Sequence, residues 1–178
     1  MHREDATSDA RAVVIETPRV ILRELTPADA DALMEFFGDP VAMRYWPRTK
    51  TRDEVLTMIE WCLKCYAERG YGLWAAVLKE TGEVVGRIGL ICQRDINGRD
   101  EVEVAYGLIP RFWGKGLATE AAAACRDHAF SRLGCDRVIS LVYKENTPSR
   151  RVAERLGMTI QGETIRADLP HWVFAVAR

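Results

Sequence analysis

A glycine-rich turn at residues 111–116 carries the residues best suited to bind a ligand. It reads Arg-Phe-Trp-Gly-Lys-Gly and stands between a strand-like stretch and an alanine-rich stretch. Gly114 and Gly116 permit the unusual backbone angles that a cradle of N–H groups needs. A helix N-terminus has unpaired N–H donors and roughly half a positive charge, so it attracts phosphate oxygens. The turn therefore predicts a diphosphate site, and with it a nucleotide-bearing cofactor.

The segments on either side of the turn predict the strand and the helix that position it. From Glu101 to Ile109, hydrophobic residues alternate with the others at a strand's period of two, and Pro110 ends the run. Over 118–133, alanines recur at spacings of three and four, as in a helix packed closely on a sheet. A plain strand-to-helix turn is the alternative interpretation. The spacing fits neither a P-loop nor the dinucleotide fingerprint, which would need a third glycine in place of Thr119.

The whole chain has the size and composition of one ordinary domain. Its 178 residues suffice for a single core and are too few for two comfortable ones. The net charge of -1, from 25 basic and 26 acidic residues, argues against a general binder of nucleic acids or membrane surfaces. No apolar run approaches the ~20 residues that cross a bilayer, and the polar N-terminus is unlike a signal peptide. We expect a cytoplasmic protein with a flexible tail at 1–12 and one domain at 13–178.

The cysteines and histidines predict neither a disulfide framework nor a metal site. Cys62 and Cys65 form a C-x-x-C, but they fall within a predicted helix, and no second Cys or His pair follows at zinc spacing. We favour core packing for Cys62. His128 and His171 are isolated, so no His-based triad can be assembled. The expected chemistry is metal-free.

Periodicity and turn residues predict the order strand, two helices, three strands, helix, strand, helix and two strands. In this setting the turn resembles the cofactor motif Arg/Gln-x-x-Gly-x-Gly/Ala of the GNAT superfamily of acetyl-coenzyme A dependent N-acetyltransferases. The similarity also covers residues 17–23, 106–120 and 146–158, where the chain resembles the branch that includes ribosomal-protein N-terminal acetyltransferases. The resemblance implies an α/β (α+β) fold. Its sheet would be mixed, mostly antiparallel and twisted, with about seven strands splayed at the cofactor cleft and about four flanking helices.

The resemblance also implies acetyl-coenzyme A as cosubstrate. The strands ending near Ile109 and Tyr143 would part, so that the pantetheine arm pairs with the first of them as an added strand. Backbone N–H groups of 112–118 would bind the diphosphate, and an N–H near Leu108 or Ile109 would polarise the thioester carbonyl. The expected cofactor-binding residues are Leu108, Ile109, Arg111, Phe112, Trp113, Gly114, Lys115, Gly116, Leu117, Ala118, Asn146 and Ser149.

The attacking amine must be neutral, which directs attention to an acidic residue on the cofactor strand. Glu103 matches a position where many relatives carry an acid, and we interpret it as the general base, acting directly or through water. A solvated strand carboxylate is the alternative, and Glu101, on the same face, is the second choice. An α-amino group, with a pKa near ~7.7–8.0, is easier to deprotonate than a lysine-like amine near ~10.4.

The departing thiolate also needs a proton or a hydrogen bond. Many relatives place a Tyr at the position of Ala153, so that acid is missing here. Ser149 stands where the ribosomal branch often has Ser, and we assign it the thiolate contact; otherwise it satisfies the backbone in a first helical turn. Asn146 either bonds the cofactor, which we favour, or caps the same helix. The expected catalytic residues are Glu103 and Ser149.

From the resemblance, the favoured hypothesis is an acceptor with a primary amine, on a protein N-terminus or a small molecule, that attacks acetyl-coenzyme A in a ternary complex. Candidate walls of its pocket are Tyr45, Trp46, Trp74 and Trp172, although such aromatics are often core residues. A non-catalytic acyl-coenzyme A binding module and a self-associating scaffold are the alternatives. A homodimer could form if the terminal strand is a free pairing edge. No nucleic-acid or membrane partner is expected.

Overall fold

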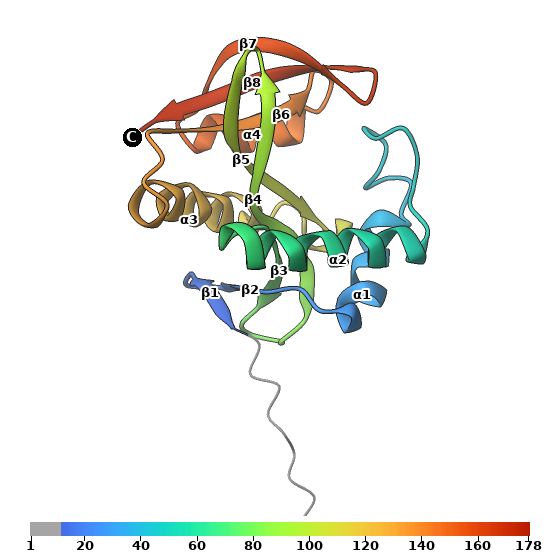
Figure 1. Cartoon of the computed structure of the whole chain (residues 1–178). Helices are drawn as coiled ribbons and strands as arrows, with labels where there is room; N and C mark the ends of the chain where they lie inside the picture. The colour runs from blue at the N-terminus through green and yellow to red at the C-terminus, as the bar shows by residue number, and fades with distance from the viewer. Residues whose placement is uncertain (1–11) are drawn as a thin grey trace, which may run out of the picture.

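The computed structural model describes residues 12–178, and all but the last residue of the tail expected at 1–12 lies outside them. Figure 1 shows one sheet with helices packed on it. The described helices are α1 (Ala30–Phe37), α2 (Arg52–Arg69), α3 (Leu117–Arg132) and α4 (Thr147–Arg155), with 3-10 turns at Pro27–Asp29 and Pro110–Phe112. The strands are β1 (Val13–Glu16), β2 (Val20–Arg23), β3 (Leu73–Leu78), β4 (Val84–Ile96), β5 (Arg99–Leu108), β6 (Arg137–Tyr143), β7 (Thr159–Arg166) and β8 (Leu169–Ala177).

The eight strands form a single sheet in the order β1-β2-β3-β4-β5-β6-β8-β7. Every neighbouring pair is antiparallel except β5 and β6, which confirms the mixed, mostly antiparallel sheet. The sheet has one strand more than expected. Residues Val13–Glu16 show no clear alternation, and they become a strand through pairing with β2. The premise for a dimer edge was wrong, because the terminal strand β8 lies between β6 and β7, and β7 is the edge strand at that end of the sheet.

The two parallel strands at the centre of the sheet part soon after they meet. Their register contains one pair, Glu103 with Ile139. Close to it, the Ser140 hydroxyl donates to the Val104 carbonyl at 2.7 Å. The pairing does not continue to Leu108, so the edge of β5 that faces β6 is open toward its C-terminal end. This confirms the splayed strands of the expected fold.

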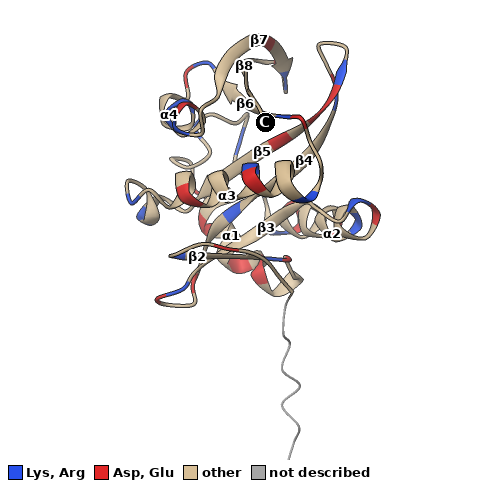
Figure 2. Ribbon diagram, turned by 90° about the vertical axis from the view of Figure 1, so that its left-hand side faces the viewer, with Lys and Arg blue, Asp and Glu red and all other residues tan. Residues whose placement is uncertain are grey.

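The pleat of the central strands assigns side chains to two faces of the sheet. Trp74 on β3 and Tyr106 on β5 share one face, where the Trp74 ring lies 6.0 Å from the ring of His128 on α3. Gly107 belongs to the other face, where a Cβ would come within 2.8 Å of the Phe36 ring on α1. Figure 2 shows α2 and α4 on opposite sides of the sheet. A cleft between β5 and β6 can therefore be reached from both faces.

The helices begin and end at signals that the sequence carries. Thr51 caps α2 in a capping box with Glu54, and Gly70 ends the helix in a left-handed conformation. Cys62 lies on the buried stripe of α2, which confirms its core packing, and all five cysteines are free thiols. Thr26 and Pro27 are typical of the cap and first position of the first expected helix, but Pro27 and the next two residues form a separate 3-10 turn before α1.

A buried ion pair fixes the chain between β2 and α1. Arg23 donates from Nη1 and Nη2 to the two carboxylate oxygens of Asp29, at 2.9 and 2.7 Å. The side chains are 11% and 4% exposed, so water screens the pair little. The planar guanidinium matches the carboxylate at both oxygens, which is the strongest form of this contact.

We expect Asp29→Ala to lower the free energy of unfolding by about 3–5 kcal/mol, because it removes the carboxylate from a buried arginine. Urea denaturation of the purified protein measures this change. The matched control is Asp31→Ala, two residues further on, where a carboxylate that is 78% exposed pairs with Arg52. The control should lose far less stability, since exposed ion pairs contribute little. Equal losses in the two variants would contradict the interpretation.

Candidate functional site

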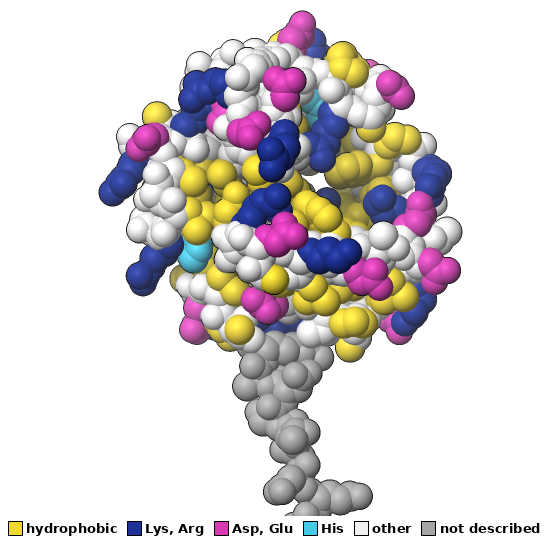
Figure 3. All heavy atoms as spheres, in the orientation of Figure 1, with side chains coloured by type: hydrophobic (Ala, Val, Ile, Leu, Met, Phe, Trp, Pro, Cys, Tyr) yellow, Lys and Arg dark blue, Asp and Glu magenta, His cyan; other side chains and the backbone are white. Residues whose placement is uncertain are grey.

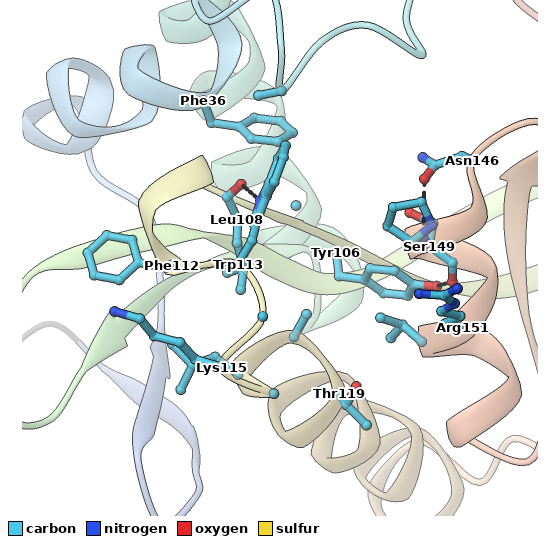
Figure 4. Close-up of a pocket in the computed structure, with 18 of the residues that line it drawn as sticks. Phe36, Tyr106, Leu108, Phe112, Trp113, Lys115, Thr119, Asn146, Ser149 and Arg151 are labelled. Atoms are coloured by element: carbon cyan, nitrogen blue, oxygen red, sulfur yellow. Dashed lines mark hydrogen bonds between the residues drawn. The ribbon is translucent and has the colours of Figure 1, made fainter.

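A cleft of about 980 Å³ lies where the glycine-rich turn, the open end of β5 and the start of α4 meet. Figure 4 shows the side chains that converge there. The structure brings together most of the residues expected to bind the cofactor. Those that line the cleft are Leu108, Phe112, Trp113, Gly114, Lys115, Gly116, Leu117, Ala118, Asn146 and Ser149.

Two of the expected cofactor residues do not line this cleft. Ile109 is 2% exposed, and its amide donates to the Val85 carbonyl on β4 at 2.9 Å. Arg111 turns away and pairs with Glu35 on α1 and, at 3.5 Å, with Glu83 in the turn before β4. Arg111 therefore fastens the glycine-rich turn to its neighbours, and its charge is already partnered by carboxylates.

The backbone of the turn explains its two glycines. Gly114 and Gly116 have φ values of 74° and 77°, in the left-handed region that favours glycine. At Gly114 a Cβ would meet nothing within 4 Å, so the requirement there is one of conformation. Gly116 is the N-cap of α3 and provides no capping side chain. The first N–H groups of α3 therefore have neither an intrahelical acceptor nor a side-chain cap.

The predicted cradle of amides is shorter than residues 112–118. The Phe112 amide donates to the Ile109 carbonyl and the Trp113 amide to the Pro110 carbonyl, each at 3.0 Å. These bonds form the 3-10 turn that leads into the cleft. The N–H groups that remain for a diphosphate are those of residues 114–118.

The opening segment of the chain fastens the cradle from the other side. The Glu120 carboxylate accepts hydrogen bonds from the Thr17 hydroxyl at 2.7 Å, the Arg19 amide at 2.8 Å and Arg19 Nε at 2.7 Å. Arg19 Nη1 also donates to the Lys115 carbonyl at 2.8 Å. Burial alone would raise the pKa of Glu120, but the bonds from Thr17 and Arg19 outweigh it and lower that pKa. Two segments a hundred residues apart thus form one rigid unit.

Positive charge surrounds the cleft. Arg44, Lys115, Arg151 and Arg155 line it, and among the described lining residues Glu120 is the sole carboxylate. Coenzyme A carries a diphosphate and a ribose phosphate, which such a surface attracts. Sequence reasoning named only Lys115, because the arginines come from the loop before α2 and from α4. The spacing of four between Arg151 and Arg155, which places both on one face of a helix, was the available signal for the α4 pair.

A second cavity, of about 350 Å³, adjoins the first. Its walls include Phe37 of α1 and Trp61 of α2, so it opens on the α1 and α2 face of the sheet. Figure 3 shows this face hollowed above α2, with hydrophobic side chains inside the hollow and basic ones beside it. The residues common to both cavities are Tyr45, Trp46, Tyr106, Asn146 and Ser149.

Glu103 lines the second cavity and is held by two hydrogen-bond donors and one ion pair. Its carboxylate accepts from Gln93 Nε2 at 2.5 Å and from the Leu141 amide at 3.3 Å, and Arg166 lies 3.8 Å away. Glu103 is 7% exposed, so it is not a solvated strand carboxylate. Glu101 is equally buried, but it pairs with Arg137 at 3.3 Å and lines neither cavity.

Tyr106 stands where the two cavities meet, and sequence reasoning had placed it only as a strand residue. Figure 4 shows it pointing from β5 toward α4, where its hydroxyl donates to the Ser149 carbonyl at 2.8 Å. Burial, and next the charge of Glu103, raises the pKa of Tyr106 far above its usual range, so the phenol remains a donor. The Asn146 side chain accepts from the Ser149 amide at 3.1 Å and so caps α4. Ala153 is fully buried.

The four aromatic residues expected around the acceptor divide into two groups. Tyr45 and Trp46 line both cavities. Trp74 is 1% exposed and packs in the core beneath α3. Trp172 lines neither cavity, and the Lys144 ammonium lies 4.0 Å from its ring centroid.

Comparison with known proteins identifies the class to which this fold and site belong. Residues 19–159 match the family model described as the acetyltransferase (GNAT) domain. The protein YkkB of Bacillus subtilis is 35% identical over 145 residues, covering 80% of this chain and 83% of that protein. The chain therefore belongs to the GNAT family, and it is an acetyl-coenzyme A dependent acetyltransferase.

Solved structures agree in fold. An acetyltransferase from Agrobacterium tumefaciens superposes with a TM-score of 0.79 at 30% identity, covering 92% of this chain and 94% of that one. A ribosomal L7/L12 α-N-protein acetyltransferase in complex with coenzyme A superposes with a TM-score of 0.74 at 19% identity, covering 93% and 98%. The second likeness is one of fold, so the resemblance to the ribosomal branch stays a prediction. Among residues 12–178, no helix is long and apolar enough to span a membrane.

We expect Gly116→Ala to weaken coenzyme A binding about tenfold, because a non-glycine residue in the left-handed region costs ~1–2 kcal/mol and relaxes the cradle. Isothermal titration with coenzyme A measures the Kd. The matched control is Gly134→Ala, after α3, where φ is 68° and a Cβ would meet nothing within 4 Å. It should cost similar stability and leave the Kd unchanged. A similar loss of affinity in both variants would refute a local effect at the cradle.

We expect Glu120→Gln to remove part of the acid sensitivity of the fold. Because the pKa of Glu120 is lowered from 4.5, its stabilising effect is complete above that pH and is lost as the pH falls through the folded value. Glutamine does not titrate, so the stability gap between wild type and variant should close on acidification. Free energies of unfolding from pH 7 to pH 3 check this, and a gap independent of pH would argue against the assignment.

Proposed function

We propose that the protein transfers the acetyl group from acetyl-coenzyme A to a primary amine by direct attack within a ternary complex. The observation that carries this proposal is the meeting of two cavities at Tyr106, one with an amide cradle and basic walls, the other with a buried carboxylate. A thioester between β5 and β6 would then be exposed to an amine that enters from the opposite face of the sheet.

The open edge of β5 supports a role in holding the pantetheine arm. The Ile109 amide bonds to β4, and alternation in an antiparallel ladder then turns the backbone groups of Leu108 and Tyr106 toward β6. The indole of Trp113 donates to the Leu108 carbonyl at 2.6 Å. This leaves the Leu108 N–H, and not that of Ile109, to bind the thioester oxygen. One such donor typically contributes ~10²–10³ in rate.

Glu103 is the proposed general base, acting directly or through a water. The Gln93 amide and the Leu141 N–H fix its carboxylate in the wall of the second cavity. An α-amino group suits this base best, because it is the amine most easily deprotonated near neutral pH.

The proposed contact to the departing thiolate is the Ser149 hydroxyl. Ser149 lies in the first turn of α4 and lines both cavities. Asn146 caps that turn through its side-chain oxygen, and its NH₂ group can still donate to the cofactor. A fully buried Ala153 offers no donor, so Tyr106 provides the other hydroxyl at this junction.

The dimer and the cytoplasmic location remain predictions.

We expect Glu103→Gln to lower kcat by ~10²–10⁴, the usual contribution of a positioned base, with an unchanged Kd for coenzyme A. Thiol release is followed with a panel of primary amines and with a peptide that has a free N-terminus. Glu101→Gln, two positions along β5, is the matched control and should keep its activity. A loss confined to Glu101→Gln would reassign the base. Tight coenzyme A binding with no turnover of any amine would refute acetyl transfer to amines.

A further inference from the structure

Arg87 is a buried cation in the wall of the second cavity. It lies on β4 opposite Gly107 of β5, and 6% of it is exposed. Its Nε and Nη1 have no hydrogen-bond partner. Its guanidinium carbon lies 5.9 and 5.5 Å from the ring centroids of Phe36 and Phe37. Aromatic rings attract a cation but accept no strong hydrogen bond, so the guanidinium has no conventional acceptor among residues 12–178.

Arg23, the other buried arginine of the α1 and α2 region, has the carboxylate partner that Arg87 lacks. Arg23 is 9% exposed and meets both carboxylate oxygens of Asp29. Buried charges in proteins are as a rule paired in this way, because removal from water is costly. Arg87 is buried slightly more deeply and has no carboxylate at ion-pair distance among the described residues. A buried cation that has no carboxylate partner and lies beside a cavity is typical of a residue that binds an anionic ligand.

The surroundings of Arg87 favour an anion in the cavity. Arg87 and Glu103 belong to the same face of the sheet, four register pairs apart, so their side chains approach one space from two ends. Lys50 and Arg166 also line this space, and Glu103 is the sole carboxylate among its described lining residues. Three cations against one anion would repel a polyamine.

We propose that the acceptor is a small molecule that carries both a primary amine and a carboxylate, with Arg87 binding the carboxylate and Glu103 facing the amine. This inference rests on the proposed function and specifies its substrate. The planar guanidinium matches a carboxylate, and a cavity of about 350 Å³ suits a molecule of amino-acid size. Arg87 and Glu103 line this cavity from the same face of the sheet, so a single molecule of this size can contact both.

The test compares the twenty amino acids with their carboxamides as acceptors, using thiol release. We expect at least one amino acid to exceed its carboxamide in kcat/KM by about 10- to 100-fold, as for a hydrogen-bonded charge pair. Arg87→Gln should raise KM by the same factor and abolish this preference, and Arg87→Lys should restore part of it. Arg94→Gln, on the same strand and with a side chain that is 75% exposed, is the control and should behave as wild type.

A second measurement does not depend on turnover. Trp46 and Trp61 line the cavity, so their fluorescence reports amino-acid binding to the coenzyme A complex. Binding should be lost in Arg87→Gln. Arg87→Met should keep or raise the Tm, because it removes a buried unpaired charge at similar volume. If Arg87 only supports the fold through Phe36 and Phe37, the Tm falls and the acceptor preference survives.

The remaining outcomes separate this inference from the proposed function. Turnover of carboxamides as efficient as that of amino acids would overturn the carboxylate claim and leave acetyl transfer intact. Arg87-dependent turnover only of peptides that begin with Asp or Glu would overturn the small-molecule claim. Arg87-dependent binding of an amino acid without turnover of any amine would support the carboxylate site and refute the proposed transfer.

Discussion

The site depends on the interruption of one parallel ladder. On its other side, β5 is paired with β4 from Gly86↔Leu108 to Ile96↔Arg99, and β6 is paired with β8 along its full length. Both strands are therefore held firmly, yet they meet each other at a single register pair. The side chain of Glu103 explains part of this, because its carboxylate occupies the Leu141 amide that a longer ladder would use. Glu103 thus contributes to the end of the ladder and also lines the second cavity.

The gap between β5 and β6 can hold a cofactor only if the amide cradle beside it is fixed in position. The glycine-rich turn is fastened on one side by Arg111 to α1 and on the other by Arg19 and Glu120 to the β1–β2 region. Neither arginine lines the cleft. Their charges fix the position of the turn, and the cations that can meet phosphates stand on other elements. This division explains how an opening segment before β2 and a turn more than ninety residues later belong to one motif.

Residue types at neighbouring positions in the sequence predicted the backbone features of the site, which are its glycine conformations and the ends of its helices and strands. The left-handed glycines, the start of α3 and the end of β6 near Tyr143 follow from residue types at adjacent positions. The cap of α4 was the alternative role considered for Asn146. The sequence could not reveal that the amides of residues 112 and 113 donate within a 3-10 turn, or that Arg44 reaches the cleft. The sequence could not reveal either that Arg87 is buried beside the second cavity. In an alternating strand, an arginine reads as a solvent-facing residue until the register and the helices above it are known.

The resemblance to the family led us to expect a tyrosine where this chain has Ala153, and the packing of β5 against α4 offers a reason for the difference. Ala153 is fully buried in the core, one helical turn beyond Ser149, whose carbonyl accepts the hydrogen bond from the Tyr106 hydroxyl. A large side chain at 153 would compete with Tyr106 for this space, since protein interiors are close-packed. The two positions are therefore coupled by volume. A phenol that enters from β5 is also kept neutral by its burial and by the charge of Glu103, so one buried carboxylate influences both sides of the junction.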